Sequence, residues 1–224
     1  MVFDVELSNP STTDVVVDVV TTTGTAGTDD YTETTITVTI PAGETSTTVT
    51  VPTTEDNIDE PNEDFTLDGT VTSGNTSNTD PSGTGTIEDD DAEPTVSISS
   101  EEETEGTDMV FDVELSNPSS TDVVLDVVTT TGTAGTDDYT ETTVTVTISA
   151  GSTSTTVTVP TTDDDIDEPT ENYTLDGTVT SGNTSNTDPS GTGTILDNDA
   201  PPTVTIGDVT VEEREDAIFD VTLS

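Results

Sequence analysis

The segment Phe111-Asp112-Val113-Glu114-Leu115 alternates apolar side chains with acidic ones. Alternation with a period of two places one row of side chains on each face of an extended chain, so the segment predicts a strand with one buried and one wet face. The same segment recurs as residues 3–7, and Phe219-Asp220-Val221 repeats its first half near the end of the sequence. A recurrence at constant spacing indicates an internal repeat.

The repeat has a period of 108 residues and organises the whole sequence. Residues 1–92 align with residues 109–200 without a gap, and 80 of the 92 positions are identical. A third copy begins at residue 201, where Pro202-Thr203-Val204 matches Pro94-Thr95-Val96. We therefore predict a repeat lacking its first strand (1–92), a complete repeat (93–200) and the first two strands of a third (201–224). The two ends of the sequence thus fall inside repeats, as expected of a segment from a longer array or of a subunit that shares strands with its neighbours.

The composition excludes several classes of function. Of 224 residues, 49 are acidic and one is basic, Arg214, and there is no His, Cys or Trp, which gives a formal net charge of −48. Nucleic-acid binding requires cations that replace phosphate counterions, so nucleic acid is not expected as a partner. No run of about 18 apolar residues is present to insert into a membrane. Nucleophilic systems built on Ser–His, Cys–His or Lys are impossible, and an enzyme is not expected.

Turn residues divide the complete repeat into seven short alternating segments, with no helical period between them. Seven antiparallel strands in about 108 residues predict an all-β fold of tandem immunoglobulin-like seven-strand β-sandwiches. The expected strands are residues 95–99, 109–116, 122–130, 142–149, 154–160, 172–180 and 190–196. The expected core comprises Val96, Ile98, Phe111, Val113, Leu115, Val123, Leu125, Val127, Tyr139, Val144, Val146, Ile148, Val157, Val159, Tyr173, Leu175, Val179 and Ile195.

Acidic residues concentrate in connections that we expect to lie at one end of the sandwich. When strands alternate in direction, the first, third and fifth connections and the exit from the last strand share one end. These segments hold Glu101–Glu105, Asp137-Asp138, Asp163–Glu171 and Asp197-Asn198-Asp199. Two carboxylates about 4 Å apart repel by roughly 4 kcal/mol at an effective dielectric constant near 20. Oxygen ligands without His or Cys favour calcium as the neutralising ion. The alternatives are a solvated acidic face and an adaptation to high salt.

The unit resembles a Calx-beta domain, the seven-strand calcium-binding module of sodium–calcium exchangers and of many large bacterial surface proteins. The resemblance rests on Thr203–Ile206 leading to Val211-Glu212-Glu213, on Gly132–Tyr139, on Asp163–Tyr173 and on Gly193–Asp199. It implies calcium as the cofactor. The ligands that it implies are Glu105, Asp163, Asp164, Glu168, Glu171, Asp197, Asn198 and Asp199 in the complete copy, Glu55, Asp56, Glu60, Glu63, Asp89, Asp90 and Asp91 in the first, and Glu213 in the third.

The sequence departs from the exchanger modules at three places. Thr131 stands where those modules carry an aspartate, Pro169 replaces an acidic residue, and Asn198 is neutral. The number of ions per repeat is therefore open. Asp137 and Asp138 are more typical of structural residues in such a turn than of ligands.

The expected function is that of calcium-dependent spacer repeats in a large extracellular adhesin or filament at a cell surface. Near-identical copies favour a spacer over a binding tip. The expected partners are neighbouring copies of the repeat, and other chains if arrays assemble into a fibre. The alternatives are a calcium-dependent carbohydrate-binding module, a calcium-sensing domain, and an acidic halophilic surface-layer or fibre protein without specific calcium sites.

Overall fold

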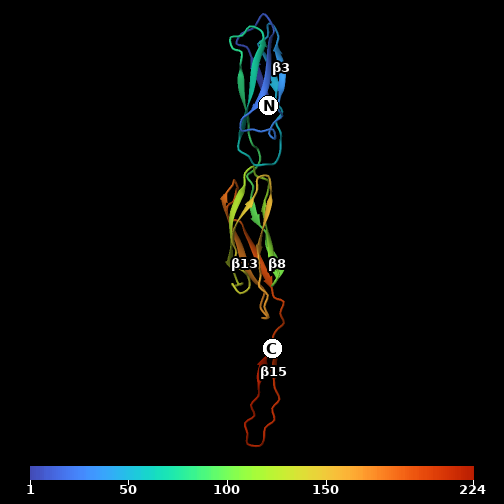
Figure 1. Cartoon of the computed structure of the whole chain (residues 1–224), viewed down its shortest axis with the longest axis vertical. Helices are drawn as coiled ribbons and strands as arrows, with labels where there is room; N and C mark the ends of the chain where they lie inside the picture. The colour runs from blue at the N-terminus through green and yellow to red at the C-terminus, as the bar shows by residue number, and fades with distance from the viewer. The chain divides into compact units, whose positions relative to one another are not determined.

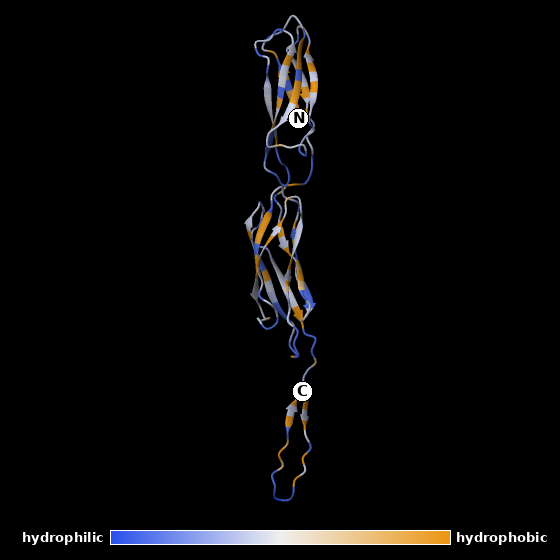
Figure 2. Cartoon of the chain, in the orientation of Figure 1, coloured by the Kyte–Doolittle hydropathy of each residue, from blue (hydrophilic) through white to orange (hydrophobic).

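Strands build the whole chain. The computed structural model describes all residues from Met1 to Ser224 and contains sixteen strands and no helix, so no helix is available that is long and apolar enough to cross a membrane. The chain divides into two units, Met1–Ala92 (unit 1) and Glu93–Ser224 (unit 2). Strands carry most of the hydrophobic residues and connections most of the hydrophilic ones (Figures 1 and 2).

Residues 93–200 of unit 2 form a sandwich of two sheets. One sheet has the order β12-β9-β7, and the other has the order β11-β10-β13-β14-β8. All but one of the strand pairs in these sheets are antiparallel. The strands are β7 (Val96–Ile98), β8 (Glu101–Thr104), β9 (Met109–Leu115), β10 (Val123–Thr131), β11 (Thr143–Ile148), β12 (Ser154–Val159), β13 (Glu171–Ser181) and β14 (Ser190–Leu196). The all-β sandwich that the sequence predicts is confirmed.

The sandwich has eight strands, one more than the sequence predicts. We expected Glu101–Thr104 to be part of an acidic loop, and this expectation was wrong. After Ile98 the chain crosses to the other sheet, where β8 pairs in parallel with the open edge of β14, Gly193 opposite Glu101. Backbone groups form this pairing, so the strand does not need an alternation of apolar and polar side chains. Its acidic side chains suit an edge strand, because charge there discourages further pairing.

Three aromatic rings occupy the centre of this sandwich. Tyr139 stacks on Tyr173 with ring centroids 4.2 Å apart, and Phe111 meets Tyr173 edge-on at 6.1 Å. All three rings are buried. Gly193 makes room for them, because a Cβ there would lie 2.5 Å from the Tyr173 ring.

The core differs from its prediction at a few positions. Val144 was expected inside but is 39% exposed, because it lies near the start of an edge strand where the facing sheet no longer covers it. Val146 and Val179 are partly buried. Met109 and Ala134 are buried members that the sequence analysis did not name.

Unit 1 repeats this sandwich without counterparts of β7 and β8. Its sheets have the orders β1-β4 and β3-β2-β5-β6. Phe65 takes the place of Tyr173 and stacks on Tyr31 at 4.3 Å. The strands are β1 (Val2–Glu6), β2 (Val15–Thr23), β3 (Thr35–Ile40), β4 (Ser46–Thr50), β5 (Glu63–Ser73) and β6 (Ser82–Ile87).

The third copy contributes a two-stranded ladder. β15 (Val204–Ile206) pairs with β16 (Val221–Leu223), with Val204 opposite Leu223. This register is that of β7 on β9, where Val96 lies opposite Leu115. The apolar side chains of β15 and β16 are exposed.

Candidate calcium site

Three connections and the exit from β14 meet at one end of the complete sandwich. Glu105 directly follows β8, Asp164 lies between β12 and β13, and Asp199 follows β14. Their carboxylate oxygens lie within 4.8 Å of one another. We call these three residues the exit cluster. Parallel pairing of β8 with β14 brings Glu105 beside the exit of β14, where the Glu105 N–H donates to the Leu196 carbonyl at 3.0 Å.

Short-range contacts hold the exit cluster in place. Glu105 is only 7% exposed, and its Oε1 accepts a hydrogen bond from the Asn198 N–H at 3.1 Å. The Asn198 side chain donates to Asp163 Oδ1 at 3.1 Å. Gly106 has a φ of 77°, and a Cβ there would lie 2.8 Å from Asp163. Only glycine fits this position without strain, because it tolerates both the left-handed backbone and the close approach.

A second group, the turn cluster, consists of Asp138, Glu168 and Glu171, whose carboxylate oxygens also lie within 4.8 Å of one another. Asp138 Oδ2 accepts a hydrogen bond from the Gly135 N–H at 2.6 Å, which is the structural role that the sequence suggested. The same carboxylate nevertheless faces two glutamates. Asp138 is thus a candidate ligand as well as a structural residue of its turn.

The two clusters border one hollow. Glu105, Asp138, Glu168, Glu171 and Asp197 line it together with Pro169 and Ile195, and its volume is about 10 Å³. A cavity of roughly 10–15 Å³ on this measure admits one water-sized particle. The hollow therefore suits a single small ion or water among five carboxylates.

Burial, together with the crowding of negative charges, raises the proton affinity of these groups. Burial is the largest cause that raises the pKa of Glu105, and the charges of Asp199, Asp197 and Asp164 raise it further. The hydrogen bond from the Asn198 N–H acts in the opposite direction but does not cancel the increase. Burial and then the hydrogen bond to Asp138 raise the pKa of Glu171. The pKa values of Glu168 and Asp199 are raised as well, with burial the largest cause in each. A site that raises carboxylate pKa values without a cation favours either protons or a metal.

Unit 1 carries the same carboxylates in a more open arrangement. Asp30, Glu60 and Glu63 form its turn cluster. Burial, followed by a hydrogen bond to Asp30 and repulsion from neighbouring acids, raises the pKa of Glu63 to about 7. Unit 1 has no counterpart of Glu105, and its acidic hollow measures about 290 Å³. Glu55, Asp56, Asp89, Asp90 and Asp91 also line that hollow.

Other residues stand apart from the clusters. Asp163 and Asn198 bond to each other at the rim of the exit cluster, and Glu213 lies in the exposed turn between β15 and β16. Asp59 is a buried carboxylate, 6% exposed, that the sequence analysis did not name; its charge is among those that raise the pKa of Asp91.

The donors fit calcium. All the candidate ligands are oxygens from several different connections, and such a set suits a cation that takes six to eight oxygen ligands in variable geometry. Asp199 Oδ2 is buried and has no hydrogen-bond partner, so a ligand atom at the exit cluster is unused. Glu105, Asp164 and Asp199 would hold an ion at the exit cluster, and Asp138, Glu168 and Glu171 at the turn cluster. A bound ion would neutralise charge there and tie the connections together.

In the absence of calcium, acidification is expected to stabilise the protein. The clustered glutamates and aspartates have pKa values above their ordinary values of 4.5 and 3.8, so the folded state binds more protons than the unfolded state. This contribution to stability is present at low pH and is lost as the pH rises through the raised pKa values. In EDTA the unfolding midpoint of unit 1 should rise by a few degrees as the pH falls from about 8 to 5.5, through the pKa of about 7 of Glu63.

Two other carboxylates set the lower pH limit of this stabilisation by acid. Hydrogen bonds from Ser82, Thr22 and Thr66 lower the pKa of Asp68, and the pKa of Asp176 is also lowered. Their contribution is lost as the pH falls through these lowered pKa values, so the gain reverses in stronger acid. With calcium bound the trend should invert, because protons then compete with the metal. A midpoint in EDTA that falls between about pH 8 and pH 5.5 contradicts this prediction.

The family model "Calx-beta domain" matches residues 1–91 and 89–209. Similar solved structures include calcium binding domain CBD12 of CALX1.1, with 16% identity, a TM-score of 0.38 and coverage of 79% of this chain and 72% of that one. They also include the apo-form Calx CBD1 domain, with 16% identity, a TM-score of 0.42 and coverage of 48% and 100%. A search of curated proteins gave no match. The two family-model matches together cover most of the sequence, and the chain belongs to the Calx-beta domain family.

Proposed function

We propose that the chain is a calcium-dependent spacer of an extracellular adhesin or surface filament. The observation that carries the proposal is the exit cluster, in which the segment directly after β14 meets a buried glutamate and the β12–β13 connection. An ion there fixes the segment through which the chain leaves the sandwich. Pro201 and Pro202 follow at once, and proline stiffens a short link.

The energetics suit an environment with abundant calcium. An ion bound at a Kd of ~0.1 mM, with calcium about a hundredfold higher, stabilises the folded state by about 2.7 kcal/mol. The net stability of a domain is about 5–15 kcal/mol, so one ion per sandwich is a substantial part of it. Affinities of about 0.1–1 mM are typical of extracellular modules. A Kd in this range would support the location that we propose, outside the cell at its surface.

Calorimetric titration with calcium, at constant high sodium concentration, tests the proposal. A Kd near ~0.1–1 mM supports a spacer, a micromolar Kd indicates a sensor, and no binding indicates an acidic surface adapted to salt. Glu105→Gln should weaken the exit site at least about tenfold, because it removes a buried charged ligand. Glu103→Gln is the matched control, since Glu103 is an exposed glutamate two positions earlier. Weakening by both variants alike would mean that diffuse charge, and not a site, attracts the ion.

A further inference from the structure

One stretch of the complete repeat carries no charge. Residues 142–162 contain no acidic or basic residue, although 49 of the 224 residues of the chain are acidic. This is the longest uncharged run in the sequence, and it comprises β11, β12 and the turn between them. A surface without charge is where two copies of so acidic a chain can approach each other with the least repulsion.

Both strands of this stretch lie at sheet edges. β11 is at one end of the order β11-β10-β13-β14-β8, and β12 is at one end of β12-β9-β7. An open edge presents unpaired N–H and C=O groups, and proteins usually protect it with charge, with proline or by keeping the strand very short. The other two edge strands follow this rule, because β8 carries Glu101–Glu103 and β7 has only three residues. β11 has six residues and none of these protections.

The hydrogen bonds of β11 show which of its backbone groups are open. The Thr129 N–H donates to the Thr142 carbonyl at 3.0 Å, so these two residues form a hydrogen-bonded pair of the antiparallel ladder. Hydrogen-bonded and non-hydrogen-bonded pairs alternate along such a ladder. The register of β10 on β11 continues from this pair. The backbone groups of Thr143, Thr145 and Thr147 therefore point away from β10, toward the open edge.

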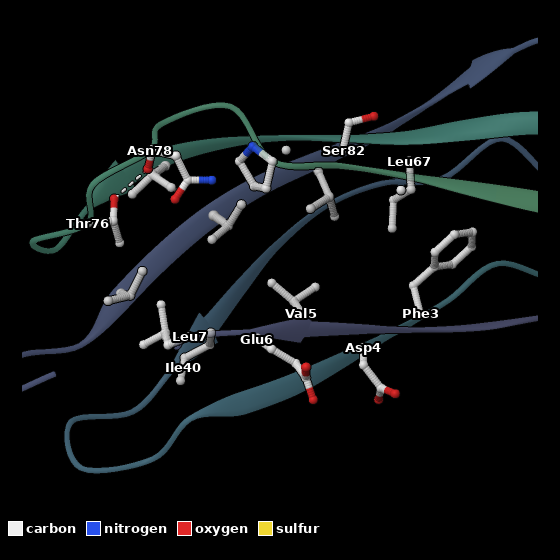
Figure 3. Close-up of a pocket in the computed structure, with 17 residues that line it drawn as sticks. Phe3, Asp4, Val5, Glu6, Leu7, Ile40, Leu67, Thr76, Asn78 and Ser82 are labelled. Carbon is white, nitrogen blue, oxygen red and sulfur yellow. Dashed lines mark hydrogen bonds between the residues drawn. The ribbon is translucent and has the colours of Figure 1, made fainter. Parts of the chain in front are cut away.

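The same edge leaves apolar surface uncovered on its inner side. Val144 belongs to the inward-facing row of β11, together with Val146 and the buried Ile148, but it is 39% exposed. Unit 1 repeats this arrangement in β3. Ile40, the last residue of β3, is buried beside the space between the two sheets (Figure 3), whereas Ile36 near its start is 43% exposed. A further strand along either edge would cover the exposed side chain.

The one acidic residue of the neighbouring strand does not prevent such an approach. Asp126 of β10 lies opposite Thr145, whose hydroxyl donates to Asp126 Oδ1 at 2.6 Å. If two sandwiches were joined along β11, their Asp126 residues would be three strand spacings apart, which is about 14 Å. That distance exceeds the Debye length of about 8 Å at physiological ionic strength, so salt screens their repulsion.

We propose that β11 of one copy of this chain pairs antiparallel with β11 of a second copy, about a two-fold axis at Thr145. The sheets of the two sandwiches then continue into each other, and the same patch serves both copies. β3 is an edge strand with the same pattern, so unit 1 offers a second contact of this kind. The contact goes beyond the proposed calcium function and does not depend on it.

The two-fold axis at Thr145 gives the register that pairs the whole strand. Thr143 then lies opposite Thr147 of the other copy, and these threonines exchange the hydrogen bonds of their open backbone groups. On the inner side Val144 lies opposite Val146 of the other copy, which covers its exposed surface. No acidic residues face each other, because the only charged residue next to β11, Glu141, falls opposite a serine.

The test is the molar mass of the full chain as a function of protein and salt concentration, by light scattering after gel filtration, in EDTA. High salt screens the repulsion of copies that each carry a net charge of −48. The expected mass exceeds that of the 23.2 kDa monomer and grows with both concentrations. A chain that stays monomeric at every protein concentration in high salt overturns the proposal. Because EDTA removes calcium, this result is separate from a failure of the calcium function.

Charged variants locate the contact. Thr35→Glu combined with Thr143→Glu places one negative charge on the open edge of each sandwich and should weaken association at least about tenfold. Thr84→Glu combined with Thr192→Glu adds the same charge at exposed residues of β6 and β14 and should leave association unchanged. Association that survives the first pair, or that both pairs weaken equally, overturns the proposal.

Two further variants test the backbone pairing and its register. Thr37→Pro combined with Thr145→Pro removes open N–H groups without adding charge, and proline is tolerated where the N–H of an edge strand faces solvent, so association should fall and both sandwiches should stay folded. The chain has no cysteine. Thr145→Cys should therefore form disulfide-linked dimers with oxidised glutathione, since residues of a hydrogen-bonded pair have Cα atoms about 5.5 Å apart. Thr192→Cys should not, and equal cross-linking of both variants would indicate random collision and contradict the two-fold contact.

Discussion

Calcium is expected to raise the midpoint of thermal unfolding of this chain by about 10–20 °C relative to EDTA. One ion per sandwich, at calcium about a hundredfold above a Kd of ~0.1 mM, contributes about 2.7 kcal/mol. For a domain of this size each kcal/mol shifts the midpoint by about 4–8 °C. The effect is large because the carboxylates of both clusters repel one another until a cation neutralises them. Differential scanning calorimetry at constant high sodium concentration measures it.

Variants show whether this gain comes from the site. The double variant Asp197→Asn, Asp199→Asn should lose the calcium gain in unit 2 and keep it in unit 1. Asp188→Asn removes one charge outside the acidic clusters and is the control, because it should leave both gains intact. Equal midpoints in EDTA and calcium at matched ionic strength would exclude calcium-dependent stability. The acidic surface would then be explained by solvation in salt alone.

Tyr173→Ala is expected to be the most damaging single substitution in unit 2. Its ring is fully buried and contacts Tyr139 and Phe111. Removal of a buried aromatic side chain costs about 3–5 kcal/mol, which includes the cavity that remains. That is a large part of the stability of a domain with so thin a core, so the midpoint of unit 2 should fall by at least about 12 °C. Calorimetry, or thermal unfolding followed by near-ultraviolet circular dichroism, measures this fall in the midpoint.

The matched control for this substitution occurs within the chain itself. Phe65 occupies the equivalent position in unit 1, is equally buried, and stacks on Tyr31 in the same way. Tyr173→Phe loses only the hydrogen bond from the hydroxyl to Met109 Sδ, 3.2 Å long, and sulfur is a weak acceptor. It should cost about 1 kcal/mol or less. A loss equal to that of Tyr173→Ala would show that the hydroxyl, and not the ring, stabilises the core.

Alternation along the sequence predicted the strands that bury one face, and β9 is the clearest example. It could not predict β8, since Glu101–Thr104 pairs through its backbone along an edge and carries no apolar pattern. It assigned Val144 to the correct face of its strand but could not give its depth, which depends on how far the facing sheet extends. Periodicity specifies the face of a strand, while coverage is a property of the assembled sandwich.

The acidic end was predictable as a region and less so as a set of contacts. Strand direction brings the connections together, so Glu105, Asp164 and Asp199 could be expected near one another. The sequence predicts a structural role for Asp138, and its local bond to Gly135 accounts for an aspartate in that turn without any ion. Its approach to Glu168 and Glu171 depends on the path of the β12–β13 connection, which the local sequence does not specify.

The parallel pairing of β8 with β14 determines how the complete sandwich bears a pulling force. β8 lies near the first residue of this sandwich and β14 near its last, and their four residue pairs run in the same direction. Tension between the two ends slides one strand along the other, so the hydrogen bonds between them share the load and must break together. An antiparallel pair loaded at one end would open one bond at a time. The acidic edge strand that the sequence pattern did not predict is therefore expected to act as a mechanical clamp, and Glu105, which follows β8 beside the loaded end of β14, joins the clamp to the exit cluster.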